Sequence, residues 1–134
     1  MKNVSVISPG AVPLGNPIQM ECHFDLEGDQ LYAVKWYKGK KEFYRFIPNE
    51  VPQSKVFPLP GVNVDLSQSD KHRVTISDAT FNLSGRYRCE VSADLSFDTA
   101  LVTTSIDVVG EYMQICQIYI NNLLIITNWN TKFV

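Results

Sequence analysis

Three cysteines and two histidines are the side chains in this sequence best suited to redox, nucleophilic or metal chemistry. His23 occupies an outward position of a predicted strand, and His72 lies in a predicted polar turn. Neither belongs to a nucleophile motif, a metal-ligand spacing or a phosphate-binding loop. We therefore expect no enzyme activity, no bound metal and no cofactor. The cysteines, Cys22, Cys89 and Cys116, are an odd number, so one of them has no partner within the chain.

An acidic group at Asp25, Glu27 and Asp29 is the one arrangement that suggests a bound cation. Carboxylate oxygens bind calcium, but an EF-hand loop needs further ligands at set positions, and these are missing here. We therefore interpret the group as a solvated turn. The net charge of −2 for the whole chain gives no electrostatic reason to expect nucleic acid as a partner.

Short apolar runs separated by turn signals recur along the chain, which is the pattern of an all-β protein. With 45% hydrophobic residues, the 134-residue chain has enough apolar material for the core of one domain. In residues 18–24 and 86–91 apolar and polar residues alternate strictly, as they do in strands with one buried face. The predicted strands cover residues 18–24, 31–37, 42–47, 62–66, 73–76, 86–91 and 97–109.

Two of the cysteines and a tryptophan occupy inward positions on three of these strands. Trp36 follows Cys22 by fourteen residues, and Cys89 follows Cys22 by sixty-seven. Tyr87 lies two residues before Cys89, which is the position of a tyrosine corner. This combination is typical of the immunoglobulin sandwich, in which a disulfide joins the two sheets and an indole packs against it. The alternative is a pair of buried free thiols.

The long interval between Cys22 and Cys89 leaves room for two additional strands, C′ and C″. We therefore predict an all-β fold, an immunoglobulin variable-type β-sandwich with two antiparallel sheets and about nine strands. On a chain-entropy model, a disulfide that closes this loop stabilises the domain by about 4 kcal/mol. Such a bond forms in an oxidising compartment, so we expect an extracellular protein, either secreted or at the cell surface.

The outside of one sheet is predicted to be a binding surface. Lys35 and Tyr37 on strand C, and Arg88 and Glu90 on strand F, alternate with inward residues and so share the outer side of that sheet. Residues 42–47 form the neighbouring strand C′ and carry three aromatic side chains, although their register is not clear from the sequence. Tyrosine, arginine and other aromatics are the residues of interface hot spots. The alternative is an ordinary charged sheet face. The predicted partner-binding residues are Lys35, Tyr37, Phe43, Tyr44, Arg45, Phe46, Arg88 and Glu90.

Two Asn-x-Ser triplets are acceptors for N-linked glycans in a secreted protein. One begins at Asn82, in the predicted exposed loop before strand F, and we expect a glycan there. The other begins at Asn3 and is the second candidate.

Several segments resemble the beaten path family of insect neuronal proteins. Residues 31–38 read Leu-Tyr-Ala-Val-Lys-Trp-Tyr-Lys, and residues 84–93 read Ser-Gly-Arg-Tyr-Arg-Cys-Glu-Val-Ser-Ala. Both stretches are far more specific than the general immunoglobulin pattern, and the similarity extends over about residues 9–109. The other similar segments are residues 22–29, 42–46 and 55–67.

This resemblance implies a role as well as a fold. Beaten path proteins are secreted or membrane-anchored, carry immunoglobulin domains, and bind cell-surface immunoglobulin receptors of the sidestep family. They act in axon guidance, including the defasciculation of motor axons. The resemblance therefore implies a sidestep-like receptor as the partner and the sheet with strands G, F, C and C′ as the docking face. The alternatives are homophilic adhesion through the same face and an immune-type domain that binds its ligand in a pocket.

The two ends of the chain differ from the domain between them. Residues 1–5 do not resemble a signal peptide, and the apolar stretch 112–127 is shorter than the roughly 20 residues that span a bilayer, so we expect no membrane anchor encoded here. Residues 110–134 form a tail of doubtful structure, which leaves residues 1–109 as the V-type domain. Gly110-Glu111-Tyr112 can be encoded by a consensus splice-donor sequence, so our hypothesis is that the tail, with Cys116, is translated intron.

Overall fold

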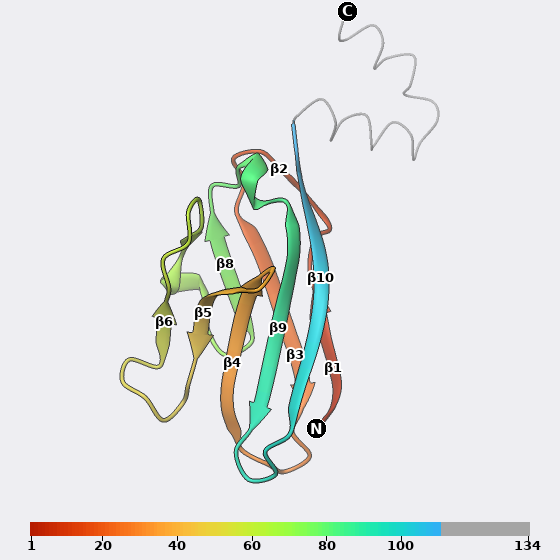
Figure 1. The fold of residues 1–134 in the computed structure, drawn as a ribbon, viewed down its shortest axis with the longest axis vertical. Coiled ribbons are helices and arrows are strands. Elements are labelled where there is room, and N and C mark those ends of the chain that lie inside the picture. Colours follow the sequence, from red (N-terminus) through yellow and green to blue (C-terminus); the bar gives the residue numbers. More distant parts are fainter. Residues whose placement is uncertain (111–134) are drawn as a thin grey trace, which may run out of the picture.

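Ten β-strands in two sheets make up the part of the chain that the structure, a computed structural model, describes, which is residues 1–110 (Figure 1). The strands are β1 (Lys2–Ile7), β2 (Ala11–Pro13), β3 (Ile18–Asp25), β4 (Leu31–Lys38), β5 (Lys41–Phe46), β6 (Ser54–Val56), β7 (Asn63–Val64), β8 (Arg73–Ser77), β9 (Gly85–Ala93) and β10 (Thr99–Val109). Two 3₁₀ turns, η1 (Leu66–Gln68) and η2 (Phe81–Leu83), lie between them.

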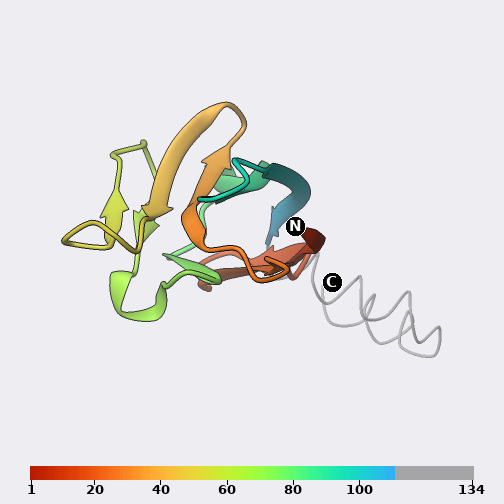
Figure 2. The ribbon, with the colours of Figure 1, turned by 90° about the horizontal axis from the view of Figure 1, so that it is seen from below.

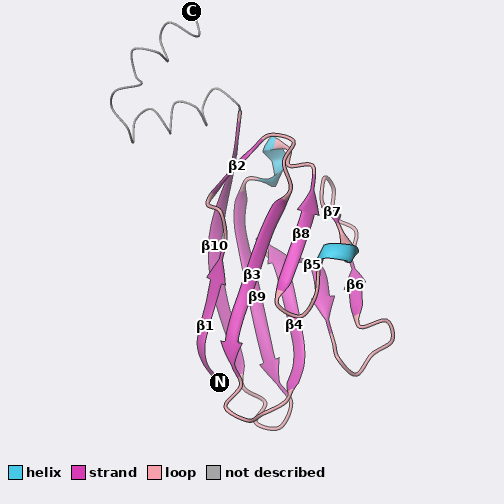
Figure 3. Cartoon of the chain, turned by 180° about the vertical axis from the view of Figure 1, so that it is seen from behind, coloured by secondary structure: helices cyan, strands magenta, loops and turns pink. Residues whose placement is uncertain are grey.

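The strand order confirms the variable-type sandwich. One sheet has the order β1-β3-β8-β7, and the other has the order β2-β10-β9-β4-β5-β6. In immunoglobulin letters these are strands A-B-E-D and A′-G-F-C-C′-C″. Figure 2 looks along the sandwich and shows the two layers, and Figure 3 shows the four-stranded sheet from its outer side.

The first strand is divided between the two sheets. It leaves β3 after Ile7 and turns at Gly10, whose φ of 77° is easily adopted only without a side chain. The following segment, β2, then pairs with β10 in parallel. This split accounts for ten strands where the sequence predicts about nine, and the β2–β10 pair is an exception to the prediction of purely antiparallel sheets.

The predicted core framework is confirmed. Cys22 on β3 and Cys89 on β9 form a disulfide that joins the two sheets, with their Cα atoms 6.4 Å apart. Trp36 lies directly opposite Cys89 in the β4–β9 pair and is fully buried. The three side chains therefore fill the space between the layers. Because the two cysteines are bonded to each other, the alternative of two buried free thiols is excluded.

Tyr87 forms the predicted tyrosine corner. Its hydroxyl donates a buried hydrogen bond to the backbone carbonyl of Leu83, at the end of η2. Burial raises the pKa of Tyr87 to about 12, so the phenol is a neutral donor at physiological pH. The ring of Phe43 meets the Tyr87 ring edge to face, with the centroids 6.0 Å apart. One side chain thus fixes both the turn before β9 and the inner side of β5.

One carboxylate joins the loops at the end of the sandwich where β4 begins and β9 ends. Asp29 accepts hydrogen bonds from the backbone N–H of Leu95 at 2.9 Å and of Ser96 at 3.0 Å. It also accepts one from the Ser96 hydroxyl at 2.6 Å. The bond from the Ser96 side chain, together with the backbone donors, lowers the pKa of Asp29 from 3.8 to about 2. The acidic group thus includes a clamp between loops, and residues 1–110 contain no cluster suited to hold a metal ion.

Some sequence predictions concern residues outside the described range. The intron hypothesis, Cys116 and the apolar stretch 112–127 all belong to residues 111–134. The division between residues 109 and 110 therefore stays a prediction, although β10 ends at Val109. Within residues 1–110, no helix is long and apolar enough to cross a membrane.

Replacing Tyr87 with phenylalanine should destabilise the domain by about 1–2 kcal/mol, because the ring is kept while the buried Leu83 carbonyl loses its donor. Urea denaturation, followed by tryptophan fluorescence, measures the change. Tyr32, which is 49% exposed, supplies the matched control: Tyr32→Phe should change the free energy of unfolding by less than about 0.5 kcal/mol. Equal losses in the two variants would show that the tyrosine corner contributes no stability.

Replacing Asp29 with asparagine should loosen the loop between β9 and β10, because the charged acceptor of two backbone amides is lost. Hydrogen exchange should show the Leu95 and Ser96 amides about tenfold less protected at neutral pH. Asp25→Asn is the control, since the Asp25 carboxylate accepts only from the nearby Glu27 amide. Unchanged protection in Asp29→Asn would contradict the clamp.

The same clamp predicts a pH dependence in the wild-type protein. Because folding lowers the pKa of Asp29, its stabilising effect is complete above the ordinary value of 3.8 and is lost as pH falls toward about 2. Protection factors of the Leu95 and Ser96 amides, corrected for intrinsic exchange, should therefore decline within that window. A decline that begins near neutral pH would assign the effect to another group.

Candidate binding face

Two central strands place the predicted polar residues on the outside of the six-stranded sheet. Lys35 lies directly opposite Glu90, and Tyr37 lies directly opposite Arg88, across the β4–β9 pair. Directly opposite residues share one face of a sheet. The intervening row at Trp36 is buried in the core, so these four side chains lie on the outer side, as the alternation predicts, and all are partly exposed.

The prediction that Phe43, Tyr44 and Phe46 belong to the exposed face is wrong for their side chains. Phe43 and Tyr44 are 0% exposed, and Phe46 packs against the core. The cause is a bulge in β5: Trp36 pairs with Tyr44 and Tyr37 pairs with Glu42, which leaves Phe43 as an extra residue. A bulge puts two consecutive residues on one side, so the aromatic run of strand C′ turns inward.

The same register places Glu42 and Arg45 on the outer side of β5. The Arg45 guanidinium donates two hydrogen bonds to the Glu42 carboxylate, one of them at 2.9 Å from Nη2 to Oε1. It also lies over the ring of Phe57, 4.7 Å from the centroid. The hydrogen bonds to Glu42 raise the pKa of Arg45, and the side chain is held in one orientation. Arg45 therefore lies on the outer side of the sheet, as predicted, whereas the predicted residues of this face did not include Glu42.

Strand β10 contributes residues that the sequence analysis did not select. Leu101 lies opposite Glu90, and Thr103 lies opposite Arg88. Leu101 is 50% exposed, which is high for a leucine in the middle of a long strand. The signal was only partly present in the sequence: polar and apolar residues alternate over residues 105–108, and this period of two, extended back along the strand, assigns residues 101 and 103 to the polar side. We call the following residues the outer face: Lys35, Tyr37, Glu42, Arg45, Arg88, Glu90, Leu101 and Thr103.

The outer face carries charges of both signs and hydrogen-bonding groups that are held in position. The Tyr37 hydroxyl points to Glu90, 3.5 Å from its Oε1. Partial burial, followed by the charges of Glu90 and Glu42, raises the pKa of Tyr37, so it is a neutral donor at physiological pH. The Nε of Arg88 is buried and has no hydrogen-bond acceptor among the described residues. A partner that supplies an acceptor there would remove the cost of this unpaired donor.

The two sequons both lie at exposed positions. Asn82 is in η2, just before β9, and Asn3 is in β1. Glycosylation at either site stays a prediction.

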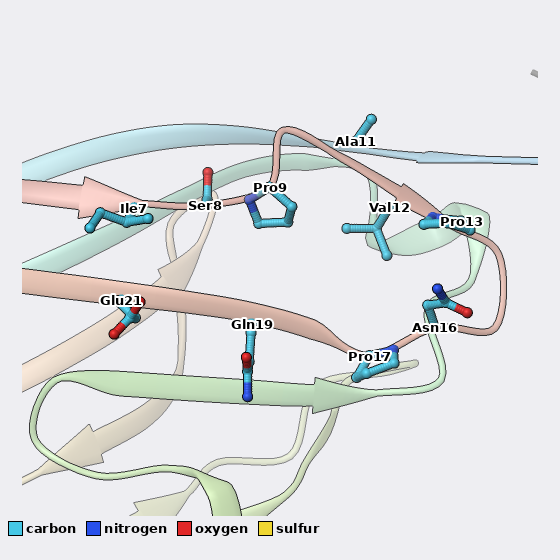
Figure 4. A pocket seen from close by; sticks show the side chains of 10 residues that line it. All are labelled: Ile7, Ser8, Pro9, Ala11, Val12, Pro13, Asn16, Pro17, Gln19 and Glu21. Atoms are coloured by element: carbon cyan, nitrogen blue, oxygen red, sulfur yellow. The ribbon is translucent and has the colours of Figure 1, made fainter. Parts of the chain in front are cut away.

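A surface cleft of about 440 Å³ opens where the first strand leaves its sheet (Figure 4). Three prolines and the neighbouring apolar side chains form much of its wall, and Glu21 is the one titratable residue among those that line it. His23 lies 3.7 Å from the Glu21 carboxylate but does not line the cleft, and the one hydroxyl in the lining, that of Ser8, is hydrogen-bonded to Thr104. The cleft therefore contains no nucleophile paired with a base, as nucleophilic catalysis requires. The cleft therefore gives no support to an enzymatic function.

Comparison with solved structures agrees with this fold. A chain in the crystal structure of the mouse coronavirus receptor-binding domain complexed with its murine receptor matches with 20% sequence identity and a TM-score of 0.65. Murine CEACAM1b matches with 20% identity and a TM-score of 0.63. In both cases the alignment covers 81% of this chain and 54% of the other, so this chain spans about half the length of these two structures.

A third structure covers a single domain. The V domain of amphioxus IgVJ-C2 matches with 14% identity and a TM-score of 0.60, over 73% of this chain and 97% of that domain. A search of curated protein sequences finds no match. The model of the immunoglobulin V-set domain matches residues 8–107. With the disulfide, the buried tryptophan and the strand order already described, this match shows that the chain belongs to the immunoglobulin V-set domain family.

Proposed function

We propose that this chain is an extracellular recognition domain that binds a cell-surface protein through the outer face. The observation that carries the proposal is the row of partly or fully exposed side chains across β10, β9, β4 and β5, in which Arg45 is hydrogen-bonded to Glu42 and Tyr37 to Glu90. Tyrosine and arginine are the residue types that most often dominate binding energy, and Tyr37, Arg45 and Arg88 lie together on one sheet. A sheet surface of this kind suits another protein better than a small molecule.

Two further observations support the extracellular, non-enzymatic part of this proposal. V-set domains are a family of recognition domains rather than enzymes. The Cys22–Cys89 disulfide needs an oxidising compartment to form and persist. One of the solved structures similar to this chain is a complex between a viral receptor-binding domain and its murine receptor. It is an example of recognition by a similar fold.

The more specific proposal is a beaten path type of function, with a sidestep-like immunoglobulin receptor as the partner, in axon guidance and motor axon defasciculation. Its support is the sequence resemblance in residues 31–38, 42–46 and 84–93. These segments correspond to β4, β5 and β9, the strands that supply most of the outer face.

Homophilic adhesion is the second candidate. Lys35 lies opposite Glu90 in the centre of the outer face, so a two-fold axis through this point would bring each lysine near a glutamate of the other copy. A charge pattern of this kind can complement itself. The same binding screen must therefore include the domain itself.

Charge reversal at Lys35 should identify the binding face. The folded domain, presented as a multimer, is screened against insect immunoglobulin-superfamily ectodomains, including sidestep-like receptors and the domain itself. For the best binder, surface plasmon resonance should show at least tenfold weaker binding for Lys35→Glu and for Arg88→Glu, because like charges then face the partner's complementary groups. Lys71→Glu makes the same charge change at an exposed position outside the six-stranded sheet and should leave the affinity unchanged.

Different results would separate the parts of the proposal. Wild-type affinity in both outer-face variants would overturn the binding face. Binding to a receptor unrelated to sidestep would overturn the beaten path assignment alone, and self-association weakened by Lys35→Glu would favour homophilic adhesion.

Asn82 should carry an N-linked glycan when the domain is secreted from insect cells. Treatment with an endoglycosidase should then lower the apparent mass of the wild-type domain, and Asn82→Gln should remove that shift. Asn3→Gln is the comparison at the other sequon. A wild-type mass that the enzyme does not change would refute both sites.

A further inference from the structure

The hairpin between β4 and β5 carries a concentration of positive charge that the outer face does not use. Five of the twelve basic residues of the chain lie in the eleven positions from Lys35 to Arg45. These two residues belong to the outer face, which leaves Lys38, Lys40 and Lys41 around the turn. Short lysine-rich runs are typical of patches that bind heparin or nucleic acid. The three lysines of the turn are therefore candidates for a separate binding site.

The hairpin lysines belong to the opposite side of the sheet from the outer face. Lys38 is directly opposite Tyr87 in the β4–β9 pair and directly opposite Lys41 in the β4–β5 pair. Because Tyr87 is buried in the core, Lys38 and Lys41 continue the inner side of the sheet at its hairpin end. Lys40 lies in the turn between them. A ligand bound here would leave the outer face uncovered.

A cleft of about 340 Å³ brings the three lysines together with a second loop. Leu59 and Pro60, from the segment between β6 and β7, form the rest of its wall. This wall is fixed, because the Val62 amide donates to the Leu59 carbonyl at 3.0 Å and the Val62 side chain is buried. The volume is within the range of sites that accept small ligands. We call this site, lined by Lys38, Lys40, Lys41, Leu59 and Pro60, the basic cleft.

The protein does not neutralise the positive charge of the basic cleft. Among residues 1–110, Lys38, Lys40 and Lys41 form no salt bridge, and no carboxylate lines the cleft. Glu42, the acidic residue nearest along the chain, lies on the other side of the sheet and is hydrogen-bonded to Arg45. Like charges directly opposite each other destabilise a sheet, so the Lys38–Lys41 pair lowers the stability of the hairpin. An anion bound between the two lysines would remove this cost.

The compartment and the shape of the cleft favour one class of anion. The Cys22–Cys89 disulfide requires an oxidising compartment, which separates the domain from nucleic acid and from the anionic lipids of the cytoplasmic leaflet. A sulfated polysaccharide supplies several anionic groups, and its sugar rings have carbon-rich faces that suit the apolar wall of Leu59 and Pro60. Because the chain has a net charge of −2, a polyanion gains attraction only at a local basic site.

We propose that the basic cleft binds a sulfated glycosaminoglycan of the cell surface or the extracellular matrix. The ammonium groups of Lys38, Lys40 and Lys41 pair with its sulfate and carboxylate groups, and a sugar ring lies against Leu59 and Pro60. The site goes beyond the receptor-binding function proposed above and is separate from the outer face. A polysaccharide held there concentrates the protein near a surface while receptor binding stays possible.

A pair of oligosaccharides tests this site directly. The probes are a heparin hexasaccharide and the same hexasaccharide after complete desulfation and N-acetylation, each titrated into the ¹⁵N-labelled protein. The sulfated probe should shift the amide signals of Gly39, Lys40, Lys41 and Gly61. It should bind about tenfold more tightly than the desulfated probe, which keeps only its carboxylates. Raising the ionic strength from about 0.15 M to about 1 M shortens the screening length from about 8 Å to about 3 Å and should abolish binding.

Two double variants separate the basic cleft from general charge effects. Lys40→Ala combined with Lys41→Ala should weaken the sulfated probe about tenfold, because two of the three ammonium groups are lost. Lys2→Ala combined with Lys71→Ala removes the same charge from exposed positions outside the cleft, and the affinity should stay within about twofold of the wild-type value. Lys41→Arg keeps the charge and should bind like the wild type.

Stability and receptor binding provide the controls for the cleft variant. Urea denaturation should show that Lys40→Ala with Lys41→Ala is at least as stable as the wild type, because the repulsion between Lys38 and Lys41 is relieved. Loss of the probe would then not reflect unfolding. The same variant should bind the receptor found in the ectodomain screen normally, so failure of the outer face and failure of the basic cleft are distinguishable.

Four outcomes would overturn the proposal. These are equal binding of the sulfated and desulfated probes, equal losses in the two double variants, signal shifts centred away from the cleft, and equally tight binding of poly-glutamate or of phosphatidylserine vesicles. The last result would assign the cleft to an acidic protein segment or to a lipid surface instead.

Discussion

The disulfide between Cys22 and Cys89 is the constraint on which the other features depend. It ties β3 to β9 across the two sheets and commits the Cys89 side chain to the interior. Because successive side chains in a strand point to opposite faces, Arg88 and Glu90 must then lie outside. The neighbouring Trp36 does the same for strand β4. The buried covalent bond thus decides which polar side chains of β9 lie on the outer face.

Strand β5 shows how a local irregularity changes that simple rule. The side chains alternate between core and surface over residues 34–37 of β4 and residues 87–93 of β9, whereas the bulge at Phe43 turns two consecutive aromatics inward. Tyr44 is buried but keeps its hydroxyl satisfied by Ser54 and by the carbonyl of Asp70. The bulge enlarges the core and simultaneously leaves Glu42 and Arg45 as the outward groups. The outer face is therefore more polar than its strand C′ sequence suggests.

The loop between β9 and β10 depends on a different kind of interaction. Asp29 and Ser96 are sixty-seven residues apart, yet a single carboxylate joins them by both a backbone and a side-chain hydrogen bond. Hydrogen bonds to an ionised group are stronger than neutral ones, which suits a clamp on an exposed loop. The clamp holds the backbone of Leu95 and Ser96, and so the loop that carries the exposed Phe97 side chain.

The sequence alone determined the sandwich, the disulfide, the buried tryptophan and the outward sides of β4 and β9, because all of these follow from residue spacing and a period of two. Tertiary structure decided the rest. The bulge that buries Phe43 and Tyr44 depends on pairing with β4, since the sequence of residues 42–46 does not reveal which of them is the extra residue. The role of Asp29 depends on a loop far away in the chain. Local pattern fixes which side a regular strand presents, whereas register and contacts between distant segments exist only once the chain has folded.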